Sequence, residues 1–213
     1  MSEVVRGSSE RGDVVLRRRD DDGALELRVN GVFVMDDRET SSEELLASVA
    51  LAGAPSRLLV GGLGLGYTVR TLLADSGVRE VVVAEIEPLL VEWMRDGVVP
   101  SVLEDPRVSV VVGDVREVVA ASGAGTLDGI LLDVDNGPDF LVYEGNAAIY
   151  ESSFLAVCKD RLRADGVLTV WSSSESSALQ DAVQAVFGHC EVTPVPVQLQ
   201  GRAETYYVYQ ASS

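Results

Sequence analysis

A glycine-rich turn between an expected strand and an expected helix is the most distinctive chemical feature of this sequence. Residues 58–68 read LLVGGLGLGYT, in which Gly62, Gly64 and Gly66 form the pattern G-x-G-x-G. Glycine lets the backbone turn tightly and lets a ligand approach closely, and the helix that follows offers free N–H groups. Tyr67 stands where a dinucleotide fingerprint needs its third glycine. The pattern therefore favours a nucleoside site, with a plain tight turn as the structural alternative.

Acidic residues follow the next two expected strands. Glu85 ends the run VVVAE, 19 residues beyond Gly66, where a carboxylate can accept hydrogen bonds from both hydroxyls of a ribose. Its neighbour Glu87 points to the other face and is expected to be solvated. Asp114 follows the run VSVVVG. It can accept a hydrogen bond from the exocyclic amine of an adenine, or cap a helix that starts at Val115, and both roles can hold together.

A third group of polar residues follows the apolar run GILL. Residues 133–138 read DVDNGP. Ligands of open α/β sheets bind beyond the carboxyl ends of the strands, so Asp133 is expected at the mouth of the pocket. There it can bind a cationic amine or take a proton from one. Asp135 and Asn136 are further catalytic candidates, although such residues also form plain turns.

The composition argues against several classes of function. The 213 residues include 17 Lys and Arg against 34 Asp and Glu, a net charge of −17, which repels nucleic-acid backbones and anionic membrane surfaces. His189 is the only histidine. A single histidine makes a Ser-His-Asp triad improbable and cannot form a histidine cluster around a metal, so we expect no metal. No apolar stretch is long enough to span a membrane. Cys158 and Cys190 are typical of reduced thiols, and we expect a cytoplasmic protein.

The pattern of elements predicts the fold class. Asn30-Gly31 between two apolar runs is a strong hairpin signal, so residues 13–36 are expected to form a small antiparallel sheet, with residues 1–12 frayed. A helix is expected over 41–51. From residue 57 strands alternate with helices, which predicts βαβ units and a mostly parallel sheet.

The expected strands of this larger sheet cover 58–60, 81–84, 108–112, 129–132, 167–171, 190–197 and 205–210. The expected helices between them cover 67–74, 88–95, 115–121, 147–163 and 176–187. The sequence thus predicts an α/β fold with a Rossmann-like, doubly wound, mostly parallel seven-stranded sheet. We expect an antiparallel C-terminal hairpin, because no helix separates the last two strands. We expect two domains, a small N-terminal β-hairpin domain with its connecting helix at 1–54 and a nucleoside-binding domain at 55–213.

Several motifs, taken in order, resemble the class I S-adenosylmethionine-dependent methyltransferase superfamily, and within it the spermidine synthases. The resemblance covers roughly residues 24–172. The motifs are GLGLGYT at 62–68, AEIE at 84–87, DPRV at 105–108, GDV at 113–115 and DVDNGP at 133–138. They are similar to the family's GGGDGGT, VEID, DPRV, GDA and D-[ST]-[ST]-D-P.

The resemblance implies a co-substrate, S-adenosylmethionine or its decarboxylated form, bound by the glycine turn, Glu85, Asp114, Val115 and Asp133. It implies that Glu85 holds ribose, that Asp114 holds the adenine amine and that Asp133 is the general base. It also implies a homodimer that pairs through the N-terminal sheet, and a small-molecule acceptor that is cationic if the acceptor is a polyamine.

Departures from the family pattern decide between methyl transfer and aminopropyl transfer. Leu65 and Asn136 stand where the family has amine-binding aspartates, and residues 38–44 read RETSSEE without the family's tyrosine or histidine. Loss of a buried carboxylate that pairs with an ammonium costs several kcal/mol. The sequence therefore predicts methyl transfer to a small molecule, with aminopropyl transfer as the alternative. A non-catalytic nucleoside-binding or scaffold protein remains a third interpretation.

Overall fold

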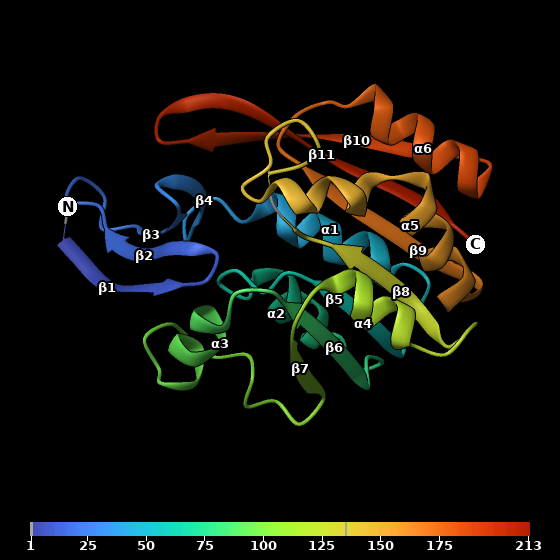
Figure 1. Ribbon diagram of the computed structural model, residues 1–213, viewed down its shortest axis with the longest axis horizontal. Helices are drawn as coiled ribbons and strands as arrows, with labels where there is room; N and C mark the ends of the chain where they lie inside the picture. Colours follow the sequence, from blue (N-terminus) through green and yellow to red (C-terminus); the bar gives the residue numbers. More distant parts are fainter. Residues whose placement is uncertain (1, 135) are drawn as a thin grey trace.

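The computed structural model describes residues 2–134 and 136–213, which fold into two sheets (Figure 1). The smaller sheet is antiparallel and its strands follow chain order. These strands are β1 (Ser2–Ser9), β2 (Gly12–Arg18), β3 (Leu25–Val29) and β4 (Val32–Asp36). Asn30 and Gly31 both have positive φ between β3 and β4, so the hairpin prediction is confirmed.

The expectation that residues 1–12 are frayed is wrong, because residues 2–9 pair with β2 along its whole length. The physical reason is a contact distant in the sequence. Strand β1 packs against helix α3 (Pro88–Arg95), so closely that a Cβ on Gly7 would lie 2.7 Å from the side chain of Leu89. Local polarity cannot reveal a contact of this kind.

The larger sheet has seven strands in the order β10-β11-β9-β8-β5-β6-β7. Neighbours from β9 to β7 are parallel, while β10 and β11 form the expected antiparallel edge. Their bounds are β5 (Arg57–Gly61), β6 (Glu80–Glu85), β7 (Val108–Val112), β8 (Leu127–Leu132), β9 (Leu162–Ser172), β10 (Glu191–Leu199) and β11 (Arg202–Ser212). The predicted doubly wound, seven-stranded fold class is confirmed.

Helices cover both faces of this sheet (Figure 1). One hydrophobic cluster joins the sheet to α1 (Ser41–Leu51), α2 (Tyr67–Leu73) and α3, and a second joins it to α4 (Val115–Ala121), α5 (Ser152–Arg161) and α6 (Ser177–Phe187). The strands between them carry apolar residues on both faces, as buried parallel strands do. No helix in residues 2–134 and 136–213 is long and apolar enough to cross a membrane.

The helix expected over residues 147–163 is interrupted. A 3₁₀ helix, η1 (Glu144–Tyr150), comes first, Glu151 is extended, and α5 follows. The hydroxyl of Tyr150 donates a hydrogen bond of 2.7 Å to the carbonyl of Val134, which fixes η1 under the loop after β8. This tertiary contact outweighs the helical propensity of the segment.

The sheet places its ligand crevice where the chain order reverses. Strand β5 lies between β6 and β8, so the loops after β5 and β8 diverge to opposite faces. The N–H of Asp133 donates to the carbonyl of Gly61 at 2.8 Å, and the N–H of Gly62 donates to the carbonyl of Ala84 at 2.8 Å. These bonds hold the glycine turn and the residues after β8 at one edge.

Candidate active site

A cavity opens at this edge, between the two sheets, and encloses about 1000 Å³ of space that is open to solvent. The glycine turn, the carboxyl ends of β6, β7 and β8, and strands β3 and β4 of the small sheet all contribute to its wall. Five acidic residues line it: Glu43, Glu85, Glu87, Asp114 and Asp133. None of the described residues that line it is Lys, Arg or His.

The glycine turn fits tightly under the cavity. Gly62 has φ +91°, and a Cβ there would lie 2.0 Å from the carbonyl oxygen of Asp133. A Cβ on Gly64 would lie 2.6 Å from the sulfur of Met35, which comes from β4. Gly62 and Gly64 line the cavity as expected, whereas Gly66 lies at the N-cap of α2 and is not among the lining residues.

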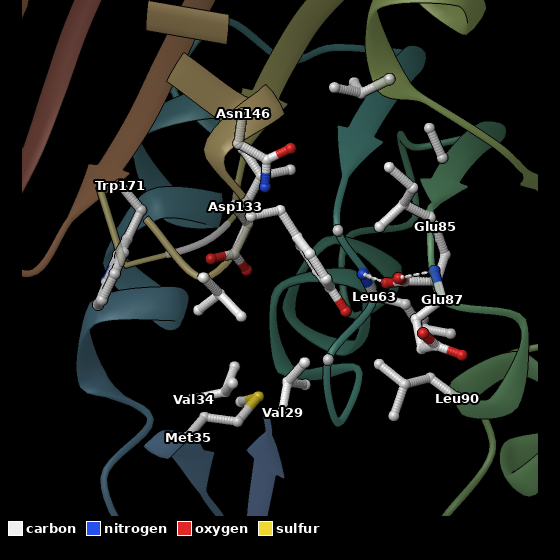
Figure 2. A pocket seen from close by; sticks show the side chains of 18 of the residues that line it. Val29, Val34, Met35, Leu63, Glu85, Glu87, Leu90, Asp133, Asn146 and Trp171 are labelled. Carbon is white, nitrogen blue, oxygen red and sulfur yellow. Dashed lines mark hydrogen bonds between the residues drawn. The ribbon is translucent and has the colours of Figure 1, made fainter. Parts of the chain in front are cut away.

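Glu85 is fixed by two backbone donors at the end of β6. Its Oε2 accepts a hydrogen bond from the N–H of Leu63, and its Oε1 accepts one from the N–H of Glu87, each at 2.7 Å (Figure 2). Burial raises the pKa of this carboxyl above its ordinary value. An ionised carboxylate has about four acceptor positions, so these two bonds leave acceptor capacity for a ligand such as a ribose diol.

The expectation that Glu87 is solvated is wrong. Its side chain is buried and lines the cavity. It caps helix α3 by accepting from the N–H of Leu89 at 3.2 Å, and the hydroxyl of Ser9 donates to it at 2.7 Å. The cause is again β1, which covers this end of α3 and excludes solvent.

Asp114 caps α4, which confirms the structural one of its two expected roles. Its Oδ1 accepts from the N–H of Arg116 at 2.8 Å. The guanidinium of Arg116 also pairs with it and lowers the pKa of the Asp114 carboxyl. Val115, the next residue, lines the cavity and packs against Gly61.

Asp133 lies on the opposite side of the cavity from Glu85 and Glu87, beside Trp171 (Figure 2). The hydroxyl of Thr68 donates to its Oδ2 at 2.6 Å. Burial raises the pKa of Asp133 to about 6, an effect that the hydrogen bond from Thr68 opposes.

Glu43 is a site residue that the sequence analysis does not single out, although it lies in the compared segment 38–44. It projects from α1, is only 7% exposed, and lines the cavity. The hydroxyl of Ser42 donates to its Oε2 at 2.6 Å. Burial, together with the charge of Asp133, raises the pKa of Glu43 to about 8. The sequence does carry a signal: Glu43 shares the helical face of Leu46, Ala47 and Ala50, which are all buried.

The structure brings Gly62, Gly64, Glu85, Asp114, Val115 and Asp133 around one cavity. Asn136 is not among the residues that line it. Its side-chain amide donates to the carbonyl of Phe33 at 3.3 Å, which ties the loop after β8 to β4. Asp135, the other catalytic candidate of this loop, lies outside the described residues.

Comparison with known proteins assigns this chain to a family. Residues 39–195 match the family model described as the spermine/spermidine synthase domain. This chain belongs to the spermine/spermidine synthase family. Among curated relatives, it is 30% identical over 170 residues to a polyamine aminopropyltransferase of Mycobacterium tuberculosis, covering 78% of this chain and 32% of that one. It is 26% identical over 196 residues to spermidine synthase 2 of Arabidopsis thaliana, covering 88% and 54%.

The chain therefore spans between a third and about half of the length of these two relatives. Among solved structures, a spermidine synthase in complex with a transition-state analogue superposes with a TM-score of 0.88 at 20% identity, covering 99% of this chain and 73% of that one. At this identity the superposition shows that the fold is shared.

The family assignment overturns the prediction of methyl transfer as the main interpretation. The matching family model is that of the spermine and spermidine synthases, and the two relatives are named for aminopropyl transfer and spermidine synthesis. The prediction rested on the missing aspartates at Leu65 and Asn136 and did not consider Glu43, which lines the cavity. That residue lies outside the fourth-strand and glycine-turn motifs, and only folding brings it to the cavity.

Proposed function

We propose that this protein transfers an aminopropyl group from decarboxylated S-adenosylmethionine to a polyamine. The observation that carries the proposal is the charge of the cavity, which has five carboxyl groups and no cationic side chain among the described lining residues. A donor with a sulfonium and a terminal ammonium suits such a wall. The carboxylate of S-adenosylmethionine itself finds no cation there, and a buried charge without a partner is strongly unfavourable.

The nucleoside part of the donor fits the side of the cavity that Glu85, Asp114 and the glycine turn form. Glu85 has two acceptor positions free for the ribose hydroxyls. Gly62 and Gly64 allow the backbone to approach the ligand. Val115, next to Asp114, supplies an apolar contact for the base.

The polyamine then lies on the side of Asp133, which serves as the general base. The amine nitrogen attacks the propyl carbon bonded to sulfur, a C–N bond forms as the C–S bond breaks, and the electron pair passes to the sulfur. The sulfonium becomes the neutral thioether of methylthioadenosine, and the amine proton passes to Asp133 and on to solvent. Orientation of the two reactants and removal of this proton are what the protein contributes.

A direct assay tests the proposal. The purified protein is incubated with decarboxylated S-adenosylmethionine and 1,4-diaminobutane, and the products are followed by mass spectrometry. We expect methylthioadenosine and the aminopropylated amine in equal amounts, and no product when S-adenosylmethionine is the donor. The proposal fails if no diamine or triamine accepts an aminopropyl group, or if S-adenosylmethionine yields a methylated amine.

We also propose that the protein forms a homodimer through its small sheet. The outer strands β1 and β4 leave Val4 and Val32 exposed, at 42% and 44%, and a four-stranded sheet gains stability from a packed partner. Light scattering at tens of micromolar protein is expected to give twice the monomer mass of 22.7 kDa. A monomeric mass at that concentration contradicts the dimer.

A further inference from the structure

Glu43 and Asp133 reach one side of the cavity from two different elements. Glu43 comes from the first turn of α1, and Asp133 directly follows β8. The charge of Asp133 acts directly on the carboxyl of Glu43. Two carboxyl groups that line one cavity and are both largely removed from water cannot both carry a negative charge at low cost. Burial and this repulsion therefore favour a proton on Glu43 near neutral pH.

The charged and titratable groups around Glu43 do not relieve this repulsion. Glu39 lies just before α1 and adds to it. Tyr67 of α2 and Tyr206 of β11 lie close enough to Glu43 to interact with its charge. Both are neutral at pH 7, since burial and, to a smaller extent, Glu43 raise their pKa values. The guanidinium of Arg70 stacks on the ring of Tyr67, 4.9 Å from its centroid.

Trp171 supplies an independent sign that a ligand completes this wall. It lines the cavity, is 7% exposed, and its indole N–H has no hydrogen-bond partner among the described residues. Buried donors are almost always paired, so a bound molecule with a lone pair is expected beside this N–H, a place that an ammonium cannot fill. Its ring lies beside Asp133 (Figure 2) and meets the ring of Tyr206 edge to face at 4.9 Å between centroids. Aromatic faces beside carboxylates suit an alkylammonium group.

We propose that Glu43 binds the ammonium group of the acceptor jointly with Asp133, and that the pair releases one proton when that ammonium enters. This inference rests on the proposed function and extends it to Glu43, which lies in the segment 38–44 that departs from the family pattern. A bound cation makes the doubly ionised pair favourable, because each carboxylate then has a positive partner. The site thus selects a charged amine and couples its binding to pH.

Calorimetry on a non-reactive complex tests the inference. Protein saturated with methylthioadenosine is titrated with 1,4-diaminobutane at pH 7 in two buffers of different ionisation enthalpy, which gives the number of protons released. We expect about one proton for the wild type and about none for Glu43→Gln, with affinity for the diamine roughly ten- to a hundredfold weaker in the variant. Glu44→Gln is the matched control, because Glu44 is the exposed neighbour on the same helix.

Titration of Glu43→Asp and the transfer assay of the wild type separate failure of this inference from failure of the proposed function. Glu43→Asp retains the charge and is expected to restore proton release, and it decides the question if Glu43→Gln does not fold. Equal diamine affinity and equal proton release in the wild type and Glu43→Gln overturn the inference. Failure of aminopropyl transfer in the wild type overturns the proposed function instead, because the calorimetric complex requires no turnover.

Discussion

The hydroxyl of Thr68, on the first turn of α2, donates a 2.6 Å hydrogen bond to Oδ2 of Asp133, which follows β8. This bond joins the end of the glycine turn to the carboxyl that we propose as the general base. It favours the ionised carboxylate and opposes the effect of burial on the pKa of Asp133. The turn is therefore expected to affect catalysis as well as nucleoside binding.

Thr68→Val is expected to move the acid limb of the kcat/KM profile to higher pH. Loss of the donor raises the pKa of Asp133 further above its ordinary value, so a higher pH is needed to ionise the base, by up to about one pH unit. Thr71→Val is the control, because the hydroxyl of Thr71 bonds within α2 to the carbonyl of Tyr67. An unshifted acid limb in Thr68→Val contradicts the role given to this bond.

Asp133→Asn is expected to reduce turnover by roughly 10²- to 10⁴-fold, because a positioned base contributes about that much. The affinity for methylthioadenosine is expected to stay within about threefold of the wild type, since the nucleoside side of the cavity is unchanged. Rates are measured by mass spectrometry and affinities by calorimetry. Asp139→Asn, at an exposed position in the same loop, is the control and is expected to keep full activity.

Glu85→Gln is expected to weaken methylthioadenosine binding roughly ten- to a hundredfold through loss of charge-assisted hydrogen bonds. The amide also cannot accept from both Leu63 and Glu87, so one backbone N–H loses its partner. This is expected to cost about 1–3 kcal/mol in the free energy of unfolding. Calorimetry and urea denaturation measure the two effects, with the exposed Glu92→Gln as control. Unchanged affinity for methylthioadenosine in Glu85→Gln would show that Glu85 does not bind the nucleoside.

Gly62→Ala is expected to destabilise the fold by about 2 kcal/mol or more. The residue has φ +91°, and the new Cβ would lie 2.0 Å from the carbonyl oxygen of Asp133, so strain adds to a direct clash. Gly53→Ala is the control, because nothing lies within 4 Å of its Cβ position. Similar urea midpoints for Gly62→Ala and Gly53→Ala would contradict the steric clash expected at Gly62.

The protein is expected to lose stability as the pH rises from about 4.5 towards 8. The pKa of Glu43 is raised from 4.5 to about 8 in the folded state, so the folded protein holds a proton that the unfolded chain has released. The free energy of unfolding therefore falls through this window. Urea denaturation at several pH values measures the fall, and Glu43→Gln is expected to flatten it. If the free energy of unfolding falls equally with pH in the wild type and in Glu43→Gln, Glu43 is not the cause of the fall.

Local patterns were sufficient for the framework of the fold. Apolar runs placed β5, β6 and β7 to within a residue or two, and Asn30-Gly31 placed the hairpin between β3 and β4. The glycine turn and the acids at the ends of β6 and β7 were found because strand order brings such positions to one edge. Each of these depends on residues close together in the sequence.

The tertiary structure alone decided which side chains share the cavity. Strand β1 packs on α3 through Gly7 and Leu89. The burial of Glu87 depends on the same strand, whose Ser9 donates a hydrogen bond to it. Glu43 lies far in the sequence from Asp133, and only the packing of α1 against the sheet brings its charge into the same wall. Local sequence therefore determined the elements and the side of the cavity that we propose for the nucleoside. The amine side depended on long-range packing, because solvation and the proximity of charges follow from which distant elements exclude water together.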